Sequence, residues 1–437
     1  MKYLHLLGVV VASLAVLALS HLLPDPVQSR AAAVGGVALV LWLSEIVPPF
    51  VPTLLLLAVV PLALSGHGEA FQVAGLLKAA ADPVVALFFG GFVLGIAASR
   101  HGVDTWIAER VVVTAHGRPG RLLALVMLAT AGLSMWMSNI AAAALMLAAL
   151  RPVTAGLPLR STLRRGLLVG TAFAANLGGM ATPIGTGPNL LAVKYSVELG
   201  KPVSFVGWMG FAVPLALVLL AGTWWYLHRR MTERALPVTT GDAVLGAGAW
   251  GVVAVFTAMV ALWLAEPLTG IPAAVVALGG AGVLFLTGLA NGREDLAKVD
   301  WGTLVLVAGG IVLGHLLERS GLVRDLAASV DWGAFGRPVL LALLATAAAL
   351  LSALMSNTAT ATLLIPIALA VIGDPAAVAV VALGCSLGCP FVISTPPNAM
   401  AAGEGGLSST DLLWPGLLLL VIGIALVVAM AQAGLLG

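Results

Sequence analysis

Two short polar runs interrupt long apolar stretches of this sequence, one in each half of the chain. Each run has two serines four residues apart and an asparagine directly after the second serine: Ser134, Ser138 and Asn139; Ser352, Ser356 and Asn357. Residues four apart share one face of a helix, and hydroxyl and amide oxygens are ligands that suit a small hard cation. A single serine pair is more often a packing feature of a membrane bundle. The recurrence of the same run in both halves favours a binding role.

A break rich in proline, glycine and asparagine follows each polar run. The two breaks read Gly185-Thr186-Gly187-Pro188-Asn189 and Ser394-Thr395-Pro396-Pro397-Asn398. Polar backbone at membrane depth is tolerated only where it is buried in protein or lines a wet cavity. Unpaired carbonyls at helix ends suit a cation, and unpaired amides at helix N-termini suit an anion. Since the four interruptions contain no Lys, Arg, Asp or Glu, they can bind both kinds of ion without a buried charged side chain.

The two sets of motifs form an internal repeat. A glycine-rich element at 90–95 matches 309–314 at an offset of 219 residues, the Ser-Asn runs match at an offset of 218, and the breaks match at an offset of 209. Three matches in the same order at nearly constant spacing are not a chance pattern. In the predicted order of spans, the first glycine-rich element runs inward and its partner runs outward, so the repeat is inverted. Inverted repeats with interrupted helices are typical of secondary transporters.

The composition places these motifs in a membrane. Of the 437 residues, 60% are apolar and 9% are charged, whereas about a quarter of the residues of a soluble domain are charged. The apolar runs are continuous rather than alternating, which favours membrane helices over barrel strands. Because a helix needs about 20 apolar residues to cross the bilayer, the sequence predicts an all-α polytopic membrane protein with about 11 transmembrane helices and two re-entrant hairpins in an inverted repeat.

Hydropathy and turn residues divide the chain into predicted segments. Transmembrane spans are predicted near 4–23, 31–48, 51–65, 84–100, 163–200, 206–228, 248–266, 271–289, 301–318, 375–400 and 411–434. The stretches of about 120–154 and 337–371 are too long for one span and carry a polar run, so we predict re-entrant hairpins there. We expect an N-terminal scaffold helix in 1–30, a first repeat in 31–235 with a broken helix at 163–200, and a second repeat in 236–437 with a broken helix at 375–400.

Basic residues predict the orientation of the chain in a cell inner membrane. With the N-terminus in the cytoplasm and the C-terminus outside, 14 of the 21 Lys and Arg residues fall on the cytoplasmic side and 7 outside, which follows the positive-inside rule. These residues are spread over short loops, so they do not indicate nucleic-acid binding. The apolar run from Leu4 to Leu19 lacks the strong basic segment of a signal peptide, and we expect it to be retained as the first membrane helix.

Together these motifs resemble those of the divalent anion–sodium symporter family. Ser138-Asn139-Ile140 and Ser356-Asn357-Thr358 are similar to its paired Ser-Asn-Thr hairpin tips. Residues 180–189 and 394–398 are similar to its two unwound-helix motifs, and Ser44-Glu45-Ile46-Val47-Pro48 resembles its early Thr-Glu-Ala-x-Pro segment. The resemblance covers nearly the whole chain in the right order.

The resemblance implies a homodimer of scaffold helices with an elevator-like transport domain, two sodium sites and one anion site. The sodium ligands that it implies are Ser134, Ser138, Asn139 and the Gly185 carbonyl in one half, and Ser352, Ser356, Asn357 and the Ser394 carbonyl in the other. The substrate residues that it implies are Ser138, Asn139, Ile140, Thr186, Gly187, Ser356, Asn357, Thr358, Thr395 and Pro396. Two of these depart from the family pattern, because Ile140 stands where threonine is frequent and Gly187 where proline is usual. The missing hydroxyl at Ile140 predicts an asymmetric pocket.

The leading hypothesis is therefore a sodium-coupled symporter of C4 dicarboxylates such as succinate, fumarate or malate, embedded in the lipid bilayer. A sodium-independent dicarboxylate exchanger of the same fold is the first alternative. A cation antiporter or metalloid-efflux protein would be expected to place ionisable residues at the hairpin tips, and this chain has none there. An intramembrane enzyme is not favoured, since the Gly384–Gly388 match to a nucleophile elbow lies in a predicted membrane helix rather than at a strand-to-helix turn.

Five other chemically capable residues lie in or near the predicted spans. His315 and Glu318, one helical turn apart, are candidates for proton coupling, although solvation or pairing at the outer interface is the favoured interpretation. Glu45 is interpreted as a structural partner of backbone groups beside the prolines that follow it. Cys385 and Cys389 are interpreted as small packing residues rather than as a disulfide or a metal site.

Overall fold

The computed structural model of this protein is built from helices. It describes residues 2–44, 46–48, 50–233, 244–322, 324–325, 332–354 and 356–436, and none of these lies in a β-strand. Glu45 and the expected boundary between the repeats at 235–236 lie outside the described residues. The predicted all-α class is confirmed.

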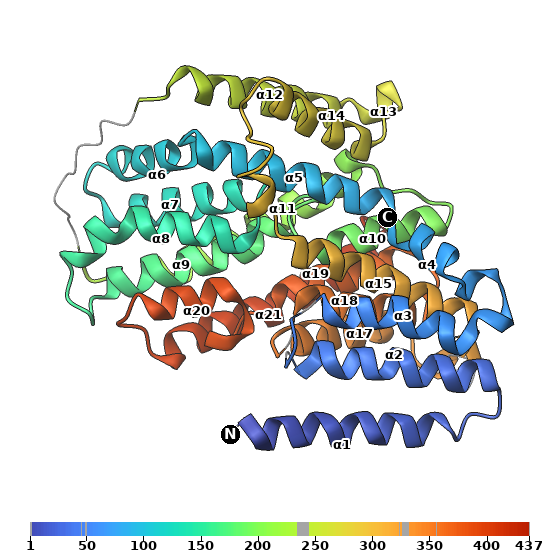
Figure 1. The fold of residues 1–437 in the computed structure, drawn as a ribbon. Coiled ribbons are helices and arrows are strands. Elements are labelled where there is room, and N and C mark those ends of the chain that lie inside the picture. Colours follow the sequence, from blue (N-terminus) through green and yellow to red (C-terminus); the bar gives the residue numbers. More distant parts are fainter. Residues whose placement is uncertain are drawn as a thin grey trace.

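Helices of the described chain are long and apolar enough for a polytopic membrane protein. Five of them meet both conditions by length and composition: α5 (Pro83–Arg100), α11 (Phe205–His228), α12 (Ala247–Leu264), α15 (Trp301–Arg319) and α21 (Ser409–Gln432). Other predicted spans coincide with α1 (Lys2–Ser20), α2 (Pro26–Ser44), α3 (Val51–Leu64) and α14 (Ala273–Leu286). In Figure 1, α1 and α2 lie along one side of the molecule and α12 and α14 along the opposite side.

Both predicted hairpins are helix pairs broken at the Ser-Asn run. The first consists of α7 (Pro119–Ser134) and α8 (Asn139–Ala155), and the second of α17 (Arg337–Ser352) and α18 (Asn357–Val371). At a rise of about 1.5 Å per residue, arms of this length reach only about 25 Å. The hydrocarbon core is about 30 Å thick. Each arm is therefore shorter than the core is thick, but so are α3 and α14, and re-entrance of the two hairpins on one side stays a prediction.

Both predicted broken helices are interrupted at the Pro-Asn motif. The first consists of α9 (Thr162–Gly179) and α10 (Gly187–Glu198), and the second of α19 (Pro375–Leu387), the short η5 (Val392–Ser394) and α20 (Pro396–Gly403). Proline lies in the first turn of α10 and of α20. Proline is tolerated there because the amides of the first turn have no intrahelical partner. The motif therefore marks the point where the second half of each broken helix begins.

The core lies around α9 and α19, which are buried along almost their whole length. Glycines allow the hairpins to approach them closely. A Cβ built on Gly178 of α9 would collide with the Ala131 carbonyl of α7, and one on Gly388, directly after α19, would collide with the Ala349 carbonyl of α17. The same contact thus occurs in both halves. It fixes each hairpin against the broken helix of its own half.

Several short helices were not predicted from the sequence. They are η1 (Ser65–His67), η2 (Glu69–Phe71), α4 (Val73–Ala80), α6 (Val103–Thr114), α13 (Glu266–Thr269), η3 (Leu296–Lys298) and η4 (Trp332–Ala334). Apart from α6, each has eight residues or fewer, which is shorter than the windows in which periodicity identifies a helix. The predicted spans omitted the helices of eight residues or fewer for this reason.

Candidate binding site between the two hairpins

The tips of the two hairpins and the breaks of the two broken helices enclose one cavity of about 670 Å³. All ten residues that the resemblance implied for substrate binding line it: Ser138, Asn139, Ile140, Thr186, Gly187, Ser356, Asn357, Thr358, Thr395 and Pro396. The two carbonyl-bearing residues implied for sodium, Gly185 and Ser394, line it as well. Motifs up to about 260 residues apart in the chain therefore meet around one space, which is within the size range of small-molecule pockets.

Four helices begin at this cavity. Their N-cap residues are Ser138 for α8, Thr186 for α10, Ser356 for α18 and Thr395 for α20, and all four line the cavity. The first amides of a helix lack intrahelical partners, and the helix dipole places partial positive charge at that end. Among the residues that the structure describes, no Lys or Arg lines this cavity. The partial positive charge in the lining thus comes from helix ends, an arrangement suited to anions, and the carboxylate of Asp300 also faces the cavity.

Behind the lining, one buried serine of each half lies within hydrogen-bond distance of two other oxygen atoms. Ser134 Oγ lies 2.8 Å from Asn139 Oδ1 and 2.7 Å from the Ala175 carbonyl. Ser352 Oγ lies 2.6 Å from Asn357 Oδ1 and 2.7 Å from the Cys385 carbonyl. A serine hydroxyl carries one proton, so it cannot donate to both oxygens at once. Each cluster has an excess of oxygen over protons, and its donor set fits a small hard cation.

The asparagines of the two breaks hold the unwound segments in place. Asn189 Nδ2 donates to the carbonyls of Gly179 (3.0 Å) and Thr182 (2.8 Å). Asn398 Nδ2 donates in the same way to the carbonyls of Cys389 and Phe391, both at 2.9 Å. These bonds satisfy carbonyls released where α9 and α19 end. No role was predicted for either asparagine from the sequence, although its presence in both breaks was the available signal.

Two glycines explain how the tips come so close to the breaks. A Cβ built on Gly179 would collide with Asn139 Oδ1, and a Cβ built on Gly187 would collide with Thr358 Oγ1. Gly187 therefore lets the tip of the second hairpin contact the break of the first half. This contact is a physical reason for glycine at a position where the family pattern has proline.

Residues that were not predicted complete the lining. Asn176 Nδ2 donates to Thr395 Oγ1 over 3.1 Å, which links α9 to the break of the other half. Asp300 accepts hydrogen bonds from the Thr303 amide (2.9 Å) and hydroxyl (2.6 Å) and so caps α15. Of the described residues that line the cavity, Asp300 is the one with a carboxylate. The spacing of Asp300 and Thr303 is that of an N-cap, but nothing in the sequence placed this cap beside the hairpins.

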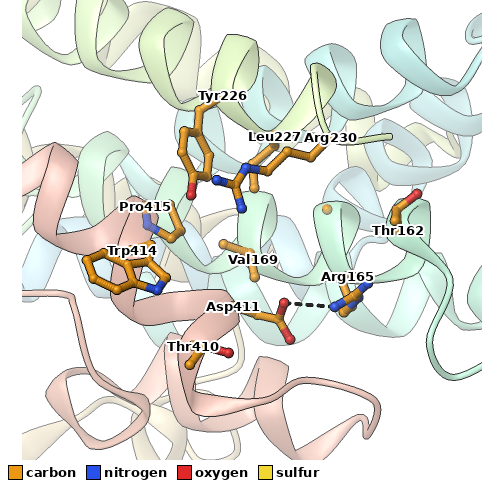
Figure 2. A pocket seen from close by; sticks show the side chains of 11 residues that line it. Thr162, Arg165, Val169, Tyr226, Leu227, Arg230, Thr410, Asp411, Trp414 and Pro415 are labelled. Carbon is orange, nitrogen blue, oxygen red and sulfur yellow. Dashed lines mark hydrogen bonds and ion pairs between the residues drawn. The ribbon is translucent and has the colours of Figure 1, made fainter. Parts of the chain in front are cut away.

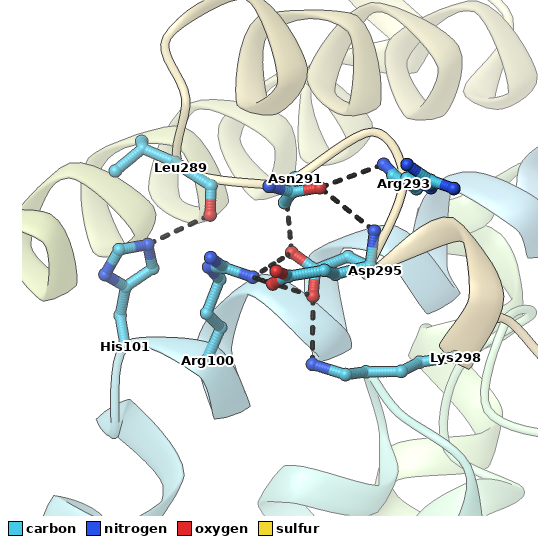
Figure 3. Close-up of polar contacts among 8 residues, drawn as sticks. Arg100, His101, Leu289, Asn291, Arg293, Asp295 and Lys298 are labelled. Carbon is cyan, nitrogen blue, oxygen red and sulfur yellow. Dashed lines mark hydrogen bonds and ion pairs between the residues drawn. The ribbon is translucent and has the colours of Figure 1, made fainter.

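A second cavity of about 590 Å³ shares Phe92, Ser138 and Asp300 with the first. Its lining also contains Arg100 and Lys298, whose side chains meet at Asp295 in the network shown in Figure 3. The Asp295 carboxylate accepts hydrogen bonds from the backbone amide of Asn291 (2.8 Å), from Lys298 Nζ (3.0 Å) and from Arg100 Nη1 (3.2 Å). Burial opposes ionisation of Asp295, but these hydrogen bonds outweigh it and lower the pKa of its carboxyl. The network joins the end of α5 to the segment before α15.

The other candidates lie away from the binding cavity. His315 Nε2 lies 3.3 Å from the Ala70 carbonyl, and Glu318 is exposed. Cys385 and Cys389 are buried free thiols, and no group of three His, Cys, Asp or Glu side chains that could hold a metal exists among the residues described. Ser386 lies inside α19 rather than on a strand-to-helix turn. The nucleophile-elbow match is therefore a helical coincidence.

A bundle of apolar helices around a polar cavity formed by four helix ends defines a multi-pass membrane transporter. Residues 39–383 and 260–436 of the chain match the citrate transporter family. An uncharacterized transporter of Haemophilus influenzae is 29% identical over 94% of this chain and 93% of its own length. The sodium-dependent dicarboxylate transporter SdcS of Staphylococcus saprophyticus is 28% identical over 99% of this chain and 92% of its own.

A solved structure shares the fold. The crystal structure of the Alcanivorax borkumensis YdaH transporter superposes with a TM-score of 0.59 at 16% sequence identity, covering 89% of this chain and 100% of that chain. The chain belongs to the citrate transporter family, and the predicted resemblance to divalent anion–sodium symporters is confirmed. Because the family and these relatives are transporters, the protein is a transporter rather than an enzyme.

Proposed function

We propose that this protein is a sodium-coupled symporter of small divalent anions, with C4 dicarboxylates such as succinate, fumarate and malate as substrates. The observation that supports this most is the pairing of four helix N-termini with two oxygen clusters around one cavity. Helix ends suit carboxylates and the oxygen clusters suit sodium. The relative SdcS, which is named a sodium-dependent dicarboxylate transporter, supports the same substrate class.

Each half of the site is proposed to bind one substrate carboxylate and one sodium ion. Ser138 and Asn139 would meet one carboxylate, and Ser356, Asn357 and Thr358 the other, with Thr186 and Thr395 beside them. The sodium ligands are proposed to be the two serines and the asparagine of each tip with the Gly185 or Ser394 carbonyl. A cation bound directly behind each carboxylate would neutralise its charge. That proximity gives the coupling a physical basis, since each ion raises the affinity for the other.

The two halves are proposed to be inverted repeats, 31–235 and 236–437, that follow an N-terminal scaffold helix. Packing supports this division, because α8 of the first half packs against α20 of the second, and α18 packs against α10. The proposal includes an inner-membrane location, a cytoplasmic N-terminus and an external C-terminus, as the distribution of basic residues indicates. A homodimer that moves the site by an elevator mechanism completes it. Alternating access around a site between inverted repeats is typical of such folds.

Uptake by reconstituted protein tests the proposed function. Labelled succinate uptake into proteoliposomes would be measured with and without an inward sodium gradient, with malate, citrate and sulfate as separate unlabelled competitors. We expect uptake to require sodium and to be lost when Asn139→Ala and Asn357→Ala are combined. Sodium-independent uptake that requires dicarboxylate inside the vesicles would instead establish an exchanger. Competition by citrate or sulfate but not by malate would move the substrate out of the C4 class.

A further inference from the structure

A third cavity, of about 510 Å³, lies away from the binding site, among the ends of three helices. The start of α9, the end of α11 and the start of α21 surround it, and Figure 2 shows side chains from all three pointing around a common space. Arg165, Arg230, Tyr226, Asp411 and Trp414 are the side chains of its lining that matter here. None of them contributes to the proposed transport site.

The positive charge in this pocket exceeds the negative charge. Arg165 Nη1 pairs with Asp411 at 3.0 Å, and the same carboxylate also accepts from the Ser408 amide and hydroxyl at 2.8 and 2.7 Å. Arg230 stacks on the Tyr226 ring at 4.3 Å, and among the described residues no carboxylate lies within 4 Å of its guanidinium. The buried Arg165 Nε has no hydrogen-bond partner. Donors on two arginines thus remain available to an anion.

A nearby acidic residue is held at the start of α9 rather than in the lining of the pocket. Glu233, which lies just after α11, accepts hydrogen bonds from Ser161, Thr162 and the Leu163 amide. Burial alone would raise the pKa of its carboxyl, but these bonds outweigh burial and lower the pKa to about 2. Its oxygens are therefore committed to the start of α9. The carboxylate of Asp411 is likewise committed to the cap of α21.

An exposed apolar stripe begins at the pocket. Trp414, which is 59% exposed, lines the pocket, and Leu418, Val421 and Ile422 follow it as exposed residues of α21. Their spacing of four, seven and eight residues from Trp414 places them on one face of the helix. α21 is among the helices that are long and apolar enough to span a membrane, and we take this face to lie in lipid. Tryptophan typically marks the boundary between the acyl chains and the headgroups.

We propose that this pocket binds the phosphate of an anionic phospholipid, with the headgroup between Arg165 and Arg230 and an acyl chain along the Trp414–Ile422 stripe. Arginine matches the geometry of phosphate oxygens, and basic pockets between membrane helices bind anionic headgroups. A soluble phosphate would contact only the arginines. Because the pocket is continuous with the apolar stripe, it fits a ligand that has both a phosphate and an acyl chain. The bound lipid would join the ends of α9, α11 and α21.

Native mass spectrometry of the full-length protein in detergent tests the proposal. Phosphatidylglycerol and phosphatidylcholine with the same acyl chains would be titrated separately. We expect a tightly bound phosphatidylglycerol, and a loss of about fivefold in its affinity in Arg230→Gln, since one arginine contributes about that factor near a lipid headgroup. Arg165→Gln is the second variant. The control is Arg121→Gln, which removes an exposed arginine at the start of α7 that does not line the pocket.

The outcomes distinguish a lipid site from a site for a soluble anion. Weaker phosphatidylglycerol binding in both pocket variants but not in the control, with an unchanged unfolding midpoint in lipid-free detergent, would support the proposal. Equal binding of phosphatidylcholine, or unchanged phosphatidylglycerol affinity in Arg230→Gln, would overturn it. Glycerol 3-phosphate or inorganic phosphate that displaces the lipid at millimolar concentration would also overturn it, in favour of a soluble-anion site that uses the same arginines.

Discussion

The two hairpins present the same polar atoms on differently packed tips. In both, the first serine of the tip contacts the asparagine Oδ1 and a carbonyl of the adjacent broken helix. Trp136 of the first tip, however, stacks on Trp263 at 5.8 Å between ring centroids and meets Phe256 edge-on at 5.1 Å. Its counterpart in the second tip, Leu354, is 66% exposed. The first tip is therefore anchored to α12, whereas the second tip has no such anchor in the described structure.

The two breaks differ in the same direction. Residues 180–186, which lead into the first break, are all buried, whereas Phe391 and Ile393, which lead into the second, are exposed. The chemistry around the cavity is thus duplicated, but the packing that supports it is not. If one half must move relative to its surroundings during transport, the less packed half is the one with the lower energetic barrier to do so. The comparison predicts equal effects for changes to ligand atoms and unequal effects for changes to packing.

Removal of either tip asparagine should have the largest effect on transport. Asn139→Ala deletes the oxygen that contacts Ser134, and Asn357→Ala deletes the one that contacts Ser352. Each change removes a ligand of the proposed sodium ion and of the proposed carboxylate, about 3 kcal/mol together. Sodium-dependent succinate uptake should fall about 100-fold in each variant. Initial uptake rates at matched protein density in proteoliposomes measure this.

The equality of those two effects is itself the test of the duplicated chemistry. Asn291→Ala is a suitable control, because Asn291 belongs to the exposed network before α15 rather than to the site. A loss of uptake in only one of the two tip variants would show that the two halves do not contribute equally to binding. Sodium dependence would then be assigned to the half whose variant lost uptake.

Unequal anchoring should appear as unequal stability. Trp136→Ala removes ring contacts with Phe205, Phe256 and Trp263 and leaves a cavity, at a cost of about 3 kcal/mol. The matched change Leu354→Ala removes an exposed side chain and should cost less than about 0.5 kcal/mol. The midpoint of thermal unfolding in detergent, followed by intrinsic fluorescence, compares the two variants. Equal midpoints would contradict the interpretation that the first tip is anchored and the second is not.

The contact between Gly187 and Thr358 should tolerate little change. Gly187→Ala places a methyl group where the Thr358 hydroxyl lies, and overpacking of this kind costs about 1–3 kcal/mol. Succinate uptake should fall about tenfold. Because the Thr358 hydroxyl is also a proposed substrate contact, relief of the clash is measured as the midpoint of thermal unfolding. The double variant Gly187→Ala with Thr358→Ser keeps the clashing hydroxyl and should stay destabilised, whereas Gly187→Ala with Thr358→Ala should recover part of the midpoint. Equal midpoints in the two double variants would exclude the hydroxyl as the cause of the destabilisation.

The polar runs and breaks could be recognised because the sequence repeats them. The Ser-Asn runs and the Pro-Asn breaks stand out against apolar surroundings. The family resemblance assigned them to a binding site, and the structure brings them together around one cavity. Asn176 offered no such signal, since the matching position in the second half is Ser386, whose hydroxyl has no hydrogen-bond partner among the described residues. Asp300 was missed for a different reason. Its cap pattern is local, but its place at the cavity depends on how α15 packs against distant helices.

The difference between the hairpins was the part least accessible from sequence. Trp136 and Leu354 are both apolar and occupy the same position of the repeat, so pattern alone treats them alike. Only the packing of α11 and α12 around the first tip gives Trp136 its partners, and that packing joins residues more than 60 positions apart. The sequence shows which positions are apolar, whereas the tertiary structure decides which side chains those positions contact.

The smallest expected effect comes from making the two tips alike. Ile140 lines the cavity and is 46% exposed, while its counterpart Thr358 presents a hydroxyl. Ile140→Thr adds a donor for a charged oxygen, worth about 1.5 kcal/mol when fully formed. The exposure of this position reduces that value, so the KM for succinate should fall about threefold. The KM for malate, which has an additional hydroxyl, should fall by more. Ile140→Val is the control because it keeps an apolar branched side chain without a hydroxyl. An unchanged KM in Ile140→Thr would place the substrate nearer the second tip than the first, and the asymmetry of the pocket would then extend from packing to binding.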